Sequence, residues 1–80
     1  MVIGDCPSGY MRKSGDIMGP GKVGQVFTAT REECAAKCTI ELRCLSFEHS
    51  HRTRLCNLND NGVPDGPQYQ DSAFFTKLGK

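Results

Sequence analysis

The chain has 80 residues, a net charge of +1 at pH 7 with neutral histidines, and five cysteines. A chain of this length makes one domain, residues 1–80, and its thin core commonly needs covalent staples. The charge is too small for a nucleic-acid partner, which needs an excess of lysine and arginine. No apolar run reaches the roughly 18 residues of a membrane span, so we expect no membrane insertion.

The N-terminal residues 1–9 are predicted to be extended and to lead into a short edge strand at Tyr10 and Met11, with Tyr10 in the core. Residues 1–4 lack the apolar segment of a secretory signal peptide. If the cysteines pair as disulfides, we therefore expect the chain to be a mature form or a piece of a longer secreted protein with neighbouring domains.

Residues 12–24 are polar and rich in turn-forming residues, so they are predicted to be a loop. Part of this loop, Gly19 to Gly24, has the glycines and the lysine of a phosphate-binding loop. However, Val23 follows the lysine at the position where that motif needs a hydroxyl for magnesium, and no apolar strand precedes it. We expect no nucleotide and no other cofactor.

Residues 25–29 form a short β-like run that leads to the one convincing helix, predicted over residues 31–40. Thr30 and Glu33 have the spacing of a capping box. We expect the Thr30 hydroxyl to accept a hydrogen bond from the Glu33 N–H, and the Glu33 carboxylate to accept one from the Thr30 N–H.

A β-hairpin is predicted after the helix, with strands at residues 44–49 and 54–58 and a short connection between them. Strict alternation would place Cys44 and Phe47 on opposite faces, so we expect Cys44 just before the strand proper or at a bulge. The predicted core consists of apolar side chains from the helix and the hairpin: Ala35, Ile40, Leu45, Phe47, Leu55 and Leu58.

Four cysteines cluster in the helix and the hairpin with the spacings C-x3-C, C-x5-C and C-x11-C. They are compatible with a zinc site or with the disulfide framework of a small secreted domain. Disulfides are favoured, because zinc sites usually use cysteine pairs on knuckles or turns, whereas the first pair here lies on one face of a helix. Five cysteines allow fifteen connectivities with one left over. Among these we favour Cys38–Cys44, which closes a short loop off the helix end, and Cys34–Cys56.

These features resemble the PAN/apple domain family: a helix carrying C-x3-C, then C-L-S-F from Cys44, then L-C-N-L around Cys56. The resemblance covers about residues 6–78, and its most specific part is residues 33–58. It implies an α+β fold with a single helix packed on a small antiparallel β-sheet and two disulfides between the same four cysteines. Apple domains add a third disulfide between the ends of the domain. Here Cys6 stands at one of those positions without a partner, so it is expected to have lost its partner or to offer a free thiol to another chain.

Residues 59–72 are predicted to be a second turn-rich loop, and residues 73–78 a final strand with one of its two phenylalanines facing the core. Residues 57–68 begin like a calcium-binding loop, with alternating asparagines followed by a glycine. The first position is Asn rather than Asp, however, and the twelfth is Gln68 rather than Glu. We expect no metal ion there.

The hairpin connection and its flanks gather polar groups into a candidate binding site: Glu48, His51, Arg52 and Arg54. This tip is expected to be exposed and held rigidly by the nearby disulfide. Arginine offers a planar fork to a carboxylate or a sulfate. Protonated histidines, His49 among them, would strengthen the binding of an acidic ligand in mildly acidic solution. A solvated polar turn is the alternative interpretation.

Catalytic groupings are poorly supported, so we expect no enzyme. On a strand, Ser46 and Glu48 share a face while His49 points away, which does not fit a catalytic triad. The family resemblance implies an extracellular, secreted binding module. One hypothesis is recognition of a glycan or glycoprotein as part of a larger adhesive protein. The other is a docking or assembly module of a secreted protein, which could dimerise through Cys6.

Overall fold

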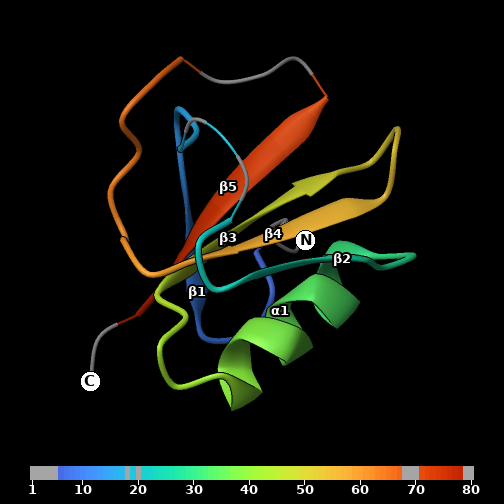
Figure 1. The fold of residues 1–80 in the computed structure, drawn as a ribbon, viewed down its shortest axis with the longest axis horizontal. Coiled ribbons are helices and arrows are strands. Elements are labelled where there is room, and N and C mark those ends of the chain that lie inside the picture. Colours follow the sequence, from blue (N-terminus) through green and yellow to red (C-terminus); the bar gives the residue numbers. More distant parts are fainter. Residues whose placement is uncertain (1–5, 18, 20, 68–70, 79–80) are drawn as a thin grey trace, which may run out of the picture.

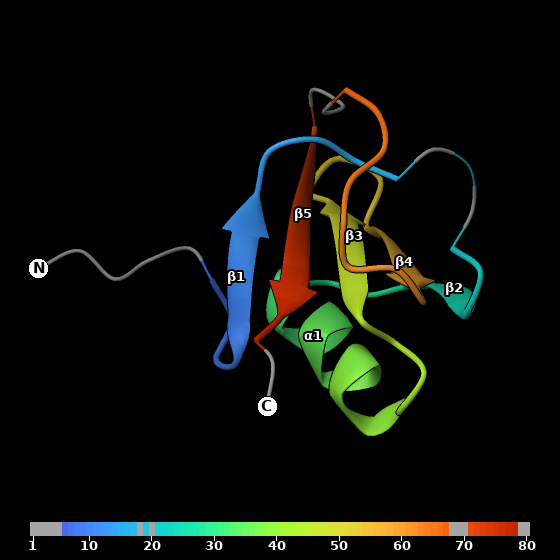
Figure 2. The same cartoon turned by 90° about the vertical axis from the view of Figure 1, so that its left-hand side faces the viewer.

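The computed structural model describes residues 6–17, 19, 21–67 and 71–78 of the chain. Figure 1 shows their helix and strands in chain order: β1 (Tyr10–Lys13), β2 (Gly24–Phe27), α1 (Arg31–Ile40), β3 (Ser46–Ser50), β4 (Leu55–Asn59) and β5 (Ser72–Lys77). The strands form one antiparallel sheet in the order β1-β5-β3-β4-β2, with β1 and β2 at its two edges (Figure 2). Helix α1 packs against the central strands β3 and β4, which is the expected α+β architecture.

Helix α1 begins and ends where the sequence predicted. The Thr30 hydroxyl accepts a hydrogen bond from the Glu33 N–H at 3.1 Å, which satisfies one of the free donors of the first turn. The Glu33 carboxylate reaches back to the N–H of Ala29 at 2.8 Å, one residue earlier than the expected bond to Thr30. Among the described residues, no helix has the length and apolar character that crossing a bilayer requires.

Two disulfides fix α1 to the sheet with the pairing that we favoured. Cys34 is bonded to Cys56 on β4, and Cys38 is bonded to Cys44, which precedes β3. All four are completely buried. These sulfurs are therefore not available as zinc ligands. Because Cys44 lies before the strand proper, the alternation of β3 needs no bulge. Cys6 is exposed and unbonded.

The core on the helix side of the sheet centres on Phe47, whose side chain is completely buried. The ring of Tyr10 meets it edge-on at 5.0 Å, and the ring of Phe75 stacks on it at 5.1 Å. Tyr10 is in the core as expected, and its hydroxyl hydrogen-bonds the Ala35 carbonyl at 3.2 Å and the Thr39 hydroxyl at 3.0 Å. The edge strand β1 is thereby tied to α1.

Three of the six predicted core residues, Ala35, Phe47 and Leu58, are buried, but the prediction was wrong for the other three. Ile40 is 79% exposed, because it follows Cys38 by about 200° around the helix and so lies on the solvent side. Leu45 precedes β3, where its backbone bonds to Asn59 and Lys77 while its side chain is 45% exposed. Leu55 is only partly buried and lies on the face away from α1.

The face of the sheet away from α1 is covered by two loops, of which the structure describes residues 14–17, 19 and 21–22 in the first and residues 60–67 in the second (Figure 1). The loops are joined to each other at Asp16 and Gly66, whose backbone groups exchange hydrogen bonds of 3.1 and 2.9 Å. Gly21 passes so close to β4 that a Cβ there would lie 2.5 Å from the Leu58 carbonyl oxygen. Beneath the loops Phe74 is completely buried, so both phenylalanines of β5 are internal, one on each face.

Candidate binding site

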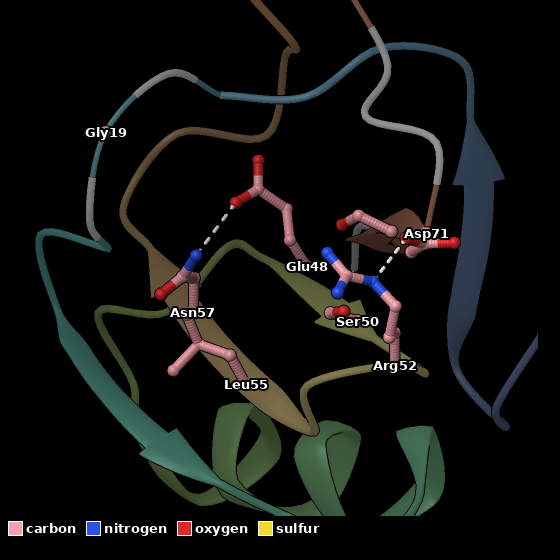
Figure 3. A pocket seen from close by; sticks show the side chains of 8 residues that line it. Gly19, Glu48, Ser50, Arg52, Leu55, Asn57 and Asp71 are labelled. Atoms are coloured by element: carbon pink, nitrogen blue, oxygen red, sulfur yellow. Dashed lines mark hydrogen bonds and ion pairs between the residues drawn. The ribbon is translucent and has the colours of Figure 1, made fainter.

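A pocket of about 410 Å³ opens on the loop-covered face of the sheet (Figure 3). Alternate residues of the two central strands point to this face, because side chains along a strand alternate between its faces. The lining combines these strand residues with one residue of the first loop, one of the hairpin connection, the residue before β5 and the first residue of β5: Gly19, Glu48, Ser50, Arg52, Leu55, Asn57, Asp71 and Ser72.

Glu48 lies on the wall of this pocket and is only 4% exposed. One carboxylate oxygen accepts a hydrogen bond from the Ile17 N–H, and the other accepts one from the Asn57 amide at 3.4 Å. Burial raises the pKa of Glu48 to about 7. The negative charges of Asp16 and Asp65 raise this pKa further, while the two hydrogen bonds oppose the rise. The carboxyl is therefore partly protonated at neutral pH.

The sequence placed Glu48 at an exposed hairpin tip, and this placement was wrong. Glu48 lies in the middle of the sheet, paired with Asn57 on one side and Phe74 on the other. The first loop crosses above it and donates the N–H of Ile17. An acidic residue among serines was interpreted as a solvent-facing position because the sequence does not show that a distant loop covers that face.

The outer rim of the pocket carries an ion pair rather than a cluster of positive charge. The Arg52 Nε lies 2.7 Å from a carboxylate oxygen of Asp71, and the His51 Nε2 lies 3.9 Å from the other. The side chains of Arg52 and His51 are 71% and 66% exposed, so these contacts contribute little to stability. They do orient the guanidinium of Arg52 over the pocket (Figure 3).

The structure separates the remaining residues of the predicted tip. Arg54 is exposed and does not line the pocket; its backbone has a φ of 69°, and its N–H bonds to the Ser50 carbonyl at 2.8 Å. His49 is buried on the helix side, with Nε2 3.0 Å from the Thr28 carbonyl oxygen. Of the four predicted binding residues, Glu48 and Arg52 thus line the pocket, and His51 lies beside it.

The pocket presents both hydrogen-bond donors and acceptors within a small volume. It contains two carboxyl groups, one guanidinium, one amide and two hydroxyls, with Leu55 as an apolar patch. Such a lining complements a compact molecule with several hydroxyl groups. A carboxyl with a pKa near 7 also suits general acid–base catalysis. Both oxygens of Glu48 already accept hydrogen bonds from the chain, and each carboxylate oxygen keeps a lone pair for one further donor.

Among the residues that the structure describes, no three acidic, histidine or cysteine side chains gather in a way that could hold a metal ion. The asparagines of the calcium-like pattern are used within the fold. Asn57 accepts a hydrogen bond from Gln25 at 2.7 Å, and the buried Asn59 donates to the Ser46 hydroxyl at 3.2 Å. Gln68, the twelfth position of that pattern, lies outside the described residues.

Several pocket residues were missed from the sequence, although the hairpin register contained a signal for two of them. In the structure Glu48 pairs with Asn57, so the two side chains share a face. Once Glu48 is chosen as a candidate and the hairpin is paired from its short connection, Asn57 and Leu55 follow as neighbours. Asp71 and Ser72 carried no comparable signal, because they reach the pocket through β5, which is distant in sequence.

Comparison with known proteins gives one finding at the level of the family. A protein-family model described as PAN domain matches residues 6–77, which is most of the chain. No curated protein and no solved structure gives a significant match. Domains of this family are disulfide-rich modules that often mediate protein or carbohydrate binding within larger proteins and are generally not catalytic.

Proposed function

Since the chain belongs to the PAN domain family, we propose that it is a single non-enzymatic binding module, residues 1–80, of a larger secreted protein. The secreted location is supported by the two buried disulfides, because such bonds persist in oxidising compartments outside the cytosol. The neighbouring parts of that larger protein would supply additional binding sites and valency.

The ligand that we propose is a carbohydrate, alone or on a glycoprotein. The observation that carries this proposal is the pocket of about 410 Å³ with carboxyl, amide, hydroxyl and guanidinium groups around it. Sugar hydroxyls donate and accept at once, so a wall with both kinds of group can satisfy them in pairs. The Arg52–Asp71 pair presents a fixed donor and a fixed acceptor at the rim.

The test is a glycan array probed with the domain in multivalent form, with neutral and sulfated glycans at neutral and mildly acidic pH. We expect selective binding, and roughly tenfold weaker binding when Arg52→Ala removes one charge-assisted donor from the rim. Arg43→Ala is the matched control, because the Arg43 side chain is 72% exposed and lies outside the pocket. Arg54→Ala should also leave the affinity unchanged, since Arg54 does not line the pocket.

A blank array would refute the carbohydrate proposal and favour the docking of another extracellular protein. Equal losses for Arg52→Ala and Arg43→Ala would show that bound glycans respond to surface charge in general and not to the pocket. Thermal denaturation of each variant separates these outcomes from misfolding, and it should show nearly unchanged midpoints because all three side chains are exposed.

A further inference from the structure

The edge strand β2 continues the pocket-bearing face of the sheet beyond the pocket itself. β2 pairs with β4 so that Gln25 faces Asn57 and Phe27 faces Leu55. Directly paired residues of an antiparallel sheet project to the same face, so these two β2 residues lie beside two residues of the pocket wall. The amide of Gln25 donates to the Asn57 oxygen at 2.7 Å, which confirms this proximity for one of the pairs.

Phe27 differs from the other exposed apolar side chains of the described residues. Its side chain is 72% exposed, and it is the one aromatic residue among the large hydrophobic residues on the surface. The others are aliphatic or methionine: Met11, Val26, Ile40, Leu42, Leu45, Val63 and Leu78. An aromatic face on the surface, one strand away from a polar pocket, is suited to a ligand that has both hydroxyl groups and a flat array of C–H groups.

A pyranose ring has this dual character. Its hydroxyls need polar partners, while its axial C–H groups carry partial positive charge and stack on the negative face of an aromatic ring. Neighbouring strands lie about 4.8 Å apart, so the ring of Phe27 is displaced from the Leu55 wall by about the size of one sugar unit. A sugar bound in the pocket would place the next unit over Phe27.

We propose that Phe27, with Gln25 beside it, forms a second subsite, so that the module recognises an oligosaccharide of at least two rings. One ring has its hydroxyls among Glu48, Asn57 and Arg52, and the adjoining ring stacks on Phe27. This inference rests on the proposed carbohydrate function and adds to it the size of the ligand and its direction across β4 and β2.

The test compares monosaccharides with their oligomers by calorimetric titration. The probes are the methyl glycosides of glucose, galactose, mannose and N-acetylglucosamine, each set against a disaccharide and a trisaccharide of the same sugar. For the sugar that binds, we expect the disaccharide to bind roughly five- to tenfold tighter than the methyl glycoside, as one aromatic contact supplies. Phe27→Leu should abolish this gain and leave the affinity for the methyl glycoside unchanged, whereas Phe27→Tyr should preserve the gain.

Val26→Thr is the control on the same strand, because Val26 pairs with Cys56 and therefore projects to the helix side. If the wild-type protein binds a methyl glycoside without any gain for the oligomers, the second subsite is refuted and the proposed function stands. The second subsite is also refuted, and the proposed function again stands, if Phe27→Leu lowers the affinities for the methyl glycoside and for the oligomer by the same factor. If no probe binds the wild-type protein, both proposals fail. Sedimentation of wild type and Phe27→Leu completes the test: a dimer lost in the variant would assign Phe27 to self-association through the β2 edge, which also refutes the subsite.

Discussion

The two faces of the sheet are built in different ways. On the helix side, aromatic rings and two disulfides form a buried core around Phe47. On the loop side, buried polar groups hold the covering segments: Glu48 accepts from Ile17, and the hydroxyl of Ser46 donates to the Asn61 carbonyl at 2.5 Å. One face is stabilised by apolar burial and covalent bonds, and the other by hydrogen bonds that a change of ligand or pH can alter.

This difference shows that the two faces of so small a domain have separate roles, one in stability and the other in binding. A domain of this size has a free energy of unfolding of only about 5 kcal/mol, so the cost of burying an ionisable carboxyl such as Glu48 needs compensation elsewhere. The disulfide-stapled side supplies that compensation. The opposite face is then free to keep a buried carboxyl and an open pocket beside it.

The largest expected effect comes from truncating the phenylalanines of β5, one on each face. Phe75→Ala should lower the free energy of unfolding by about 4 kcal/mol, because the rigid helix-side core cannot collapse around the cavity. Phe74→Ala should cost about 2–3 kcal/mol, since loops can move into the space more easily than a stapled helix can. Urea denaturation measures both. Equal losses would contradict the assignment of a rigid and a yielding face.

Removal of the longer disulfide should come next. Cys34→Ala with Cys56→Ala opens a bridge between residues 22 apart and should cost about 3 kcal/mol through the greater freedom of the unfolded chain. Cys38→Ala with Cys44→Ala, where the separation is 6, should cost about 2 kcal/mol. Urea denaturation of both variants under oxidising conditions gives the comparison. A larger loss for the shorter bridge would show that local strain or packing outweighs chain entropy.

The loop side should instead make the free energy of unfolding depend on pH, through the titration of Glu48. The folded protein holds a proton on Glu48 up to about pH 7, whereas the unfolded chain releases it near the ordinary value of 4.5. The contribution of Glu48 to the free energy of unfolding is therefore fully present below pH 4.5 and is lost as the pH rises through 7. The loss is on the order of 3 kcal/mol.

Glu48→Gln removes this titration while keeping the shape of the side chain. We expect its free energy of unfolding to vary less than that of the wild type between pH 5 and 8, with the variant more stable at pH 8. Urea denaturation at several pH values gives both curves. Parallel curves over this range would mean that burial of Glu48 does not raise its pKa.

The smallest effect is expected at Arg54, outside both cores. Its φ of 69° lies in the left-handed region, which glycine adopts without steric cost. Arg54→Gly should raise the free energy of unfolding by up to about 0.5–1 kcal/mol. Thermal denaturation against Arg43→Gly, an exposed arginine outside the turn, tests it. A loss of stability at Arg54 would show that its side chain contributes more than the backbone strain costs.

The helix side could be predicted from the sequence because its determinants are local. The Thr30 cap, the spacing of Cys34 and Cys38, and the short return to Cys44 all lie in one continuous stretch, residues 30–44. The family resemblance agreed with this arrangement. Even here Leu45 and Ile40 were wrongly predicted to be in the core. Hydrophobicity alone does not show whether a side chain just before a strand, or in the last turn of a helix, points to the core or to solvent.

The loop side could not be predicted to the same degree because its contacts join distant parts of the chain. Ile17 and Glu48 are 31 residues apart, and neither the loop sequence nor the strand sequence shows that they meet. Arg52 and its partner Asp71 are 19 residues apart. Sequence reasoning therefore found two of the pocket residues, Glu48 and Arg52, but for the wrong reason. It placed them on an exposed hairpin tip, whereas in the structure they line a pocket.

The pairing of β1 with β5 determines how the module responds to mechanical tension. Tyr10 at the start of β1 lies opposite Lys77 at the end of β5, so a pull on these two points opens the strand pair like a zipper, one bond at a time. After β1 has peeled away, the Cys34–Cys56 bridge keeps the intervening segment from extending. The 22 residues that it spans withhold roughly 75 Å of length, so under load the domain would yield early at its edge and stop short of full extension.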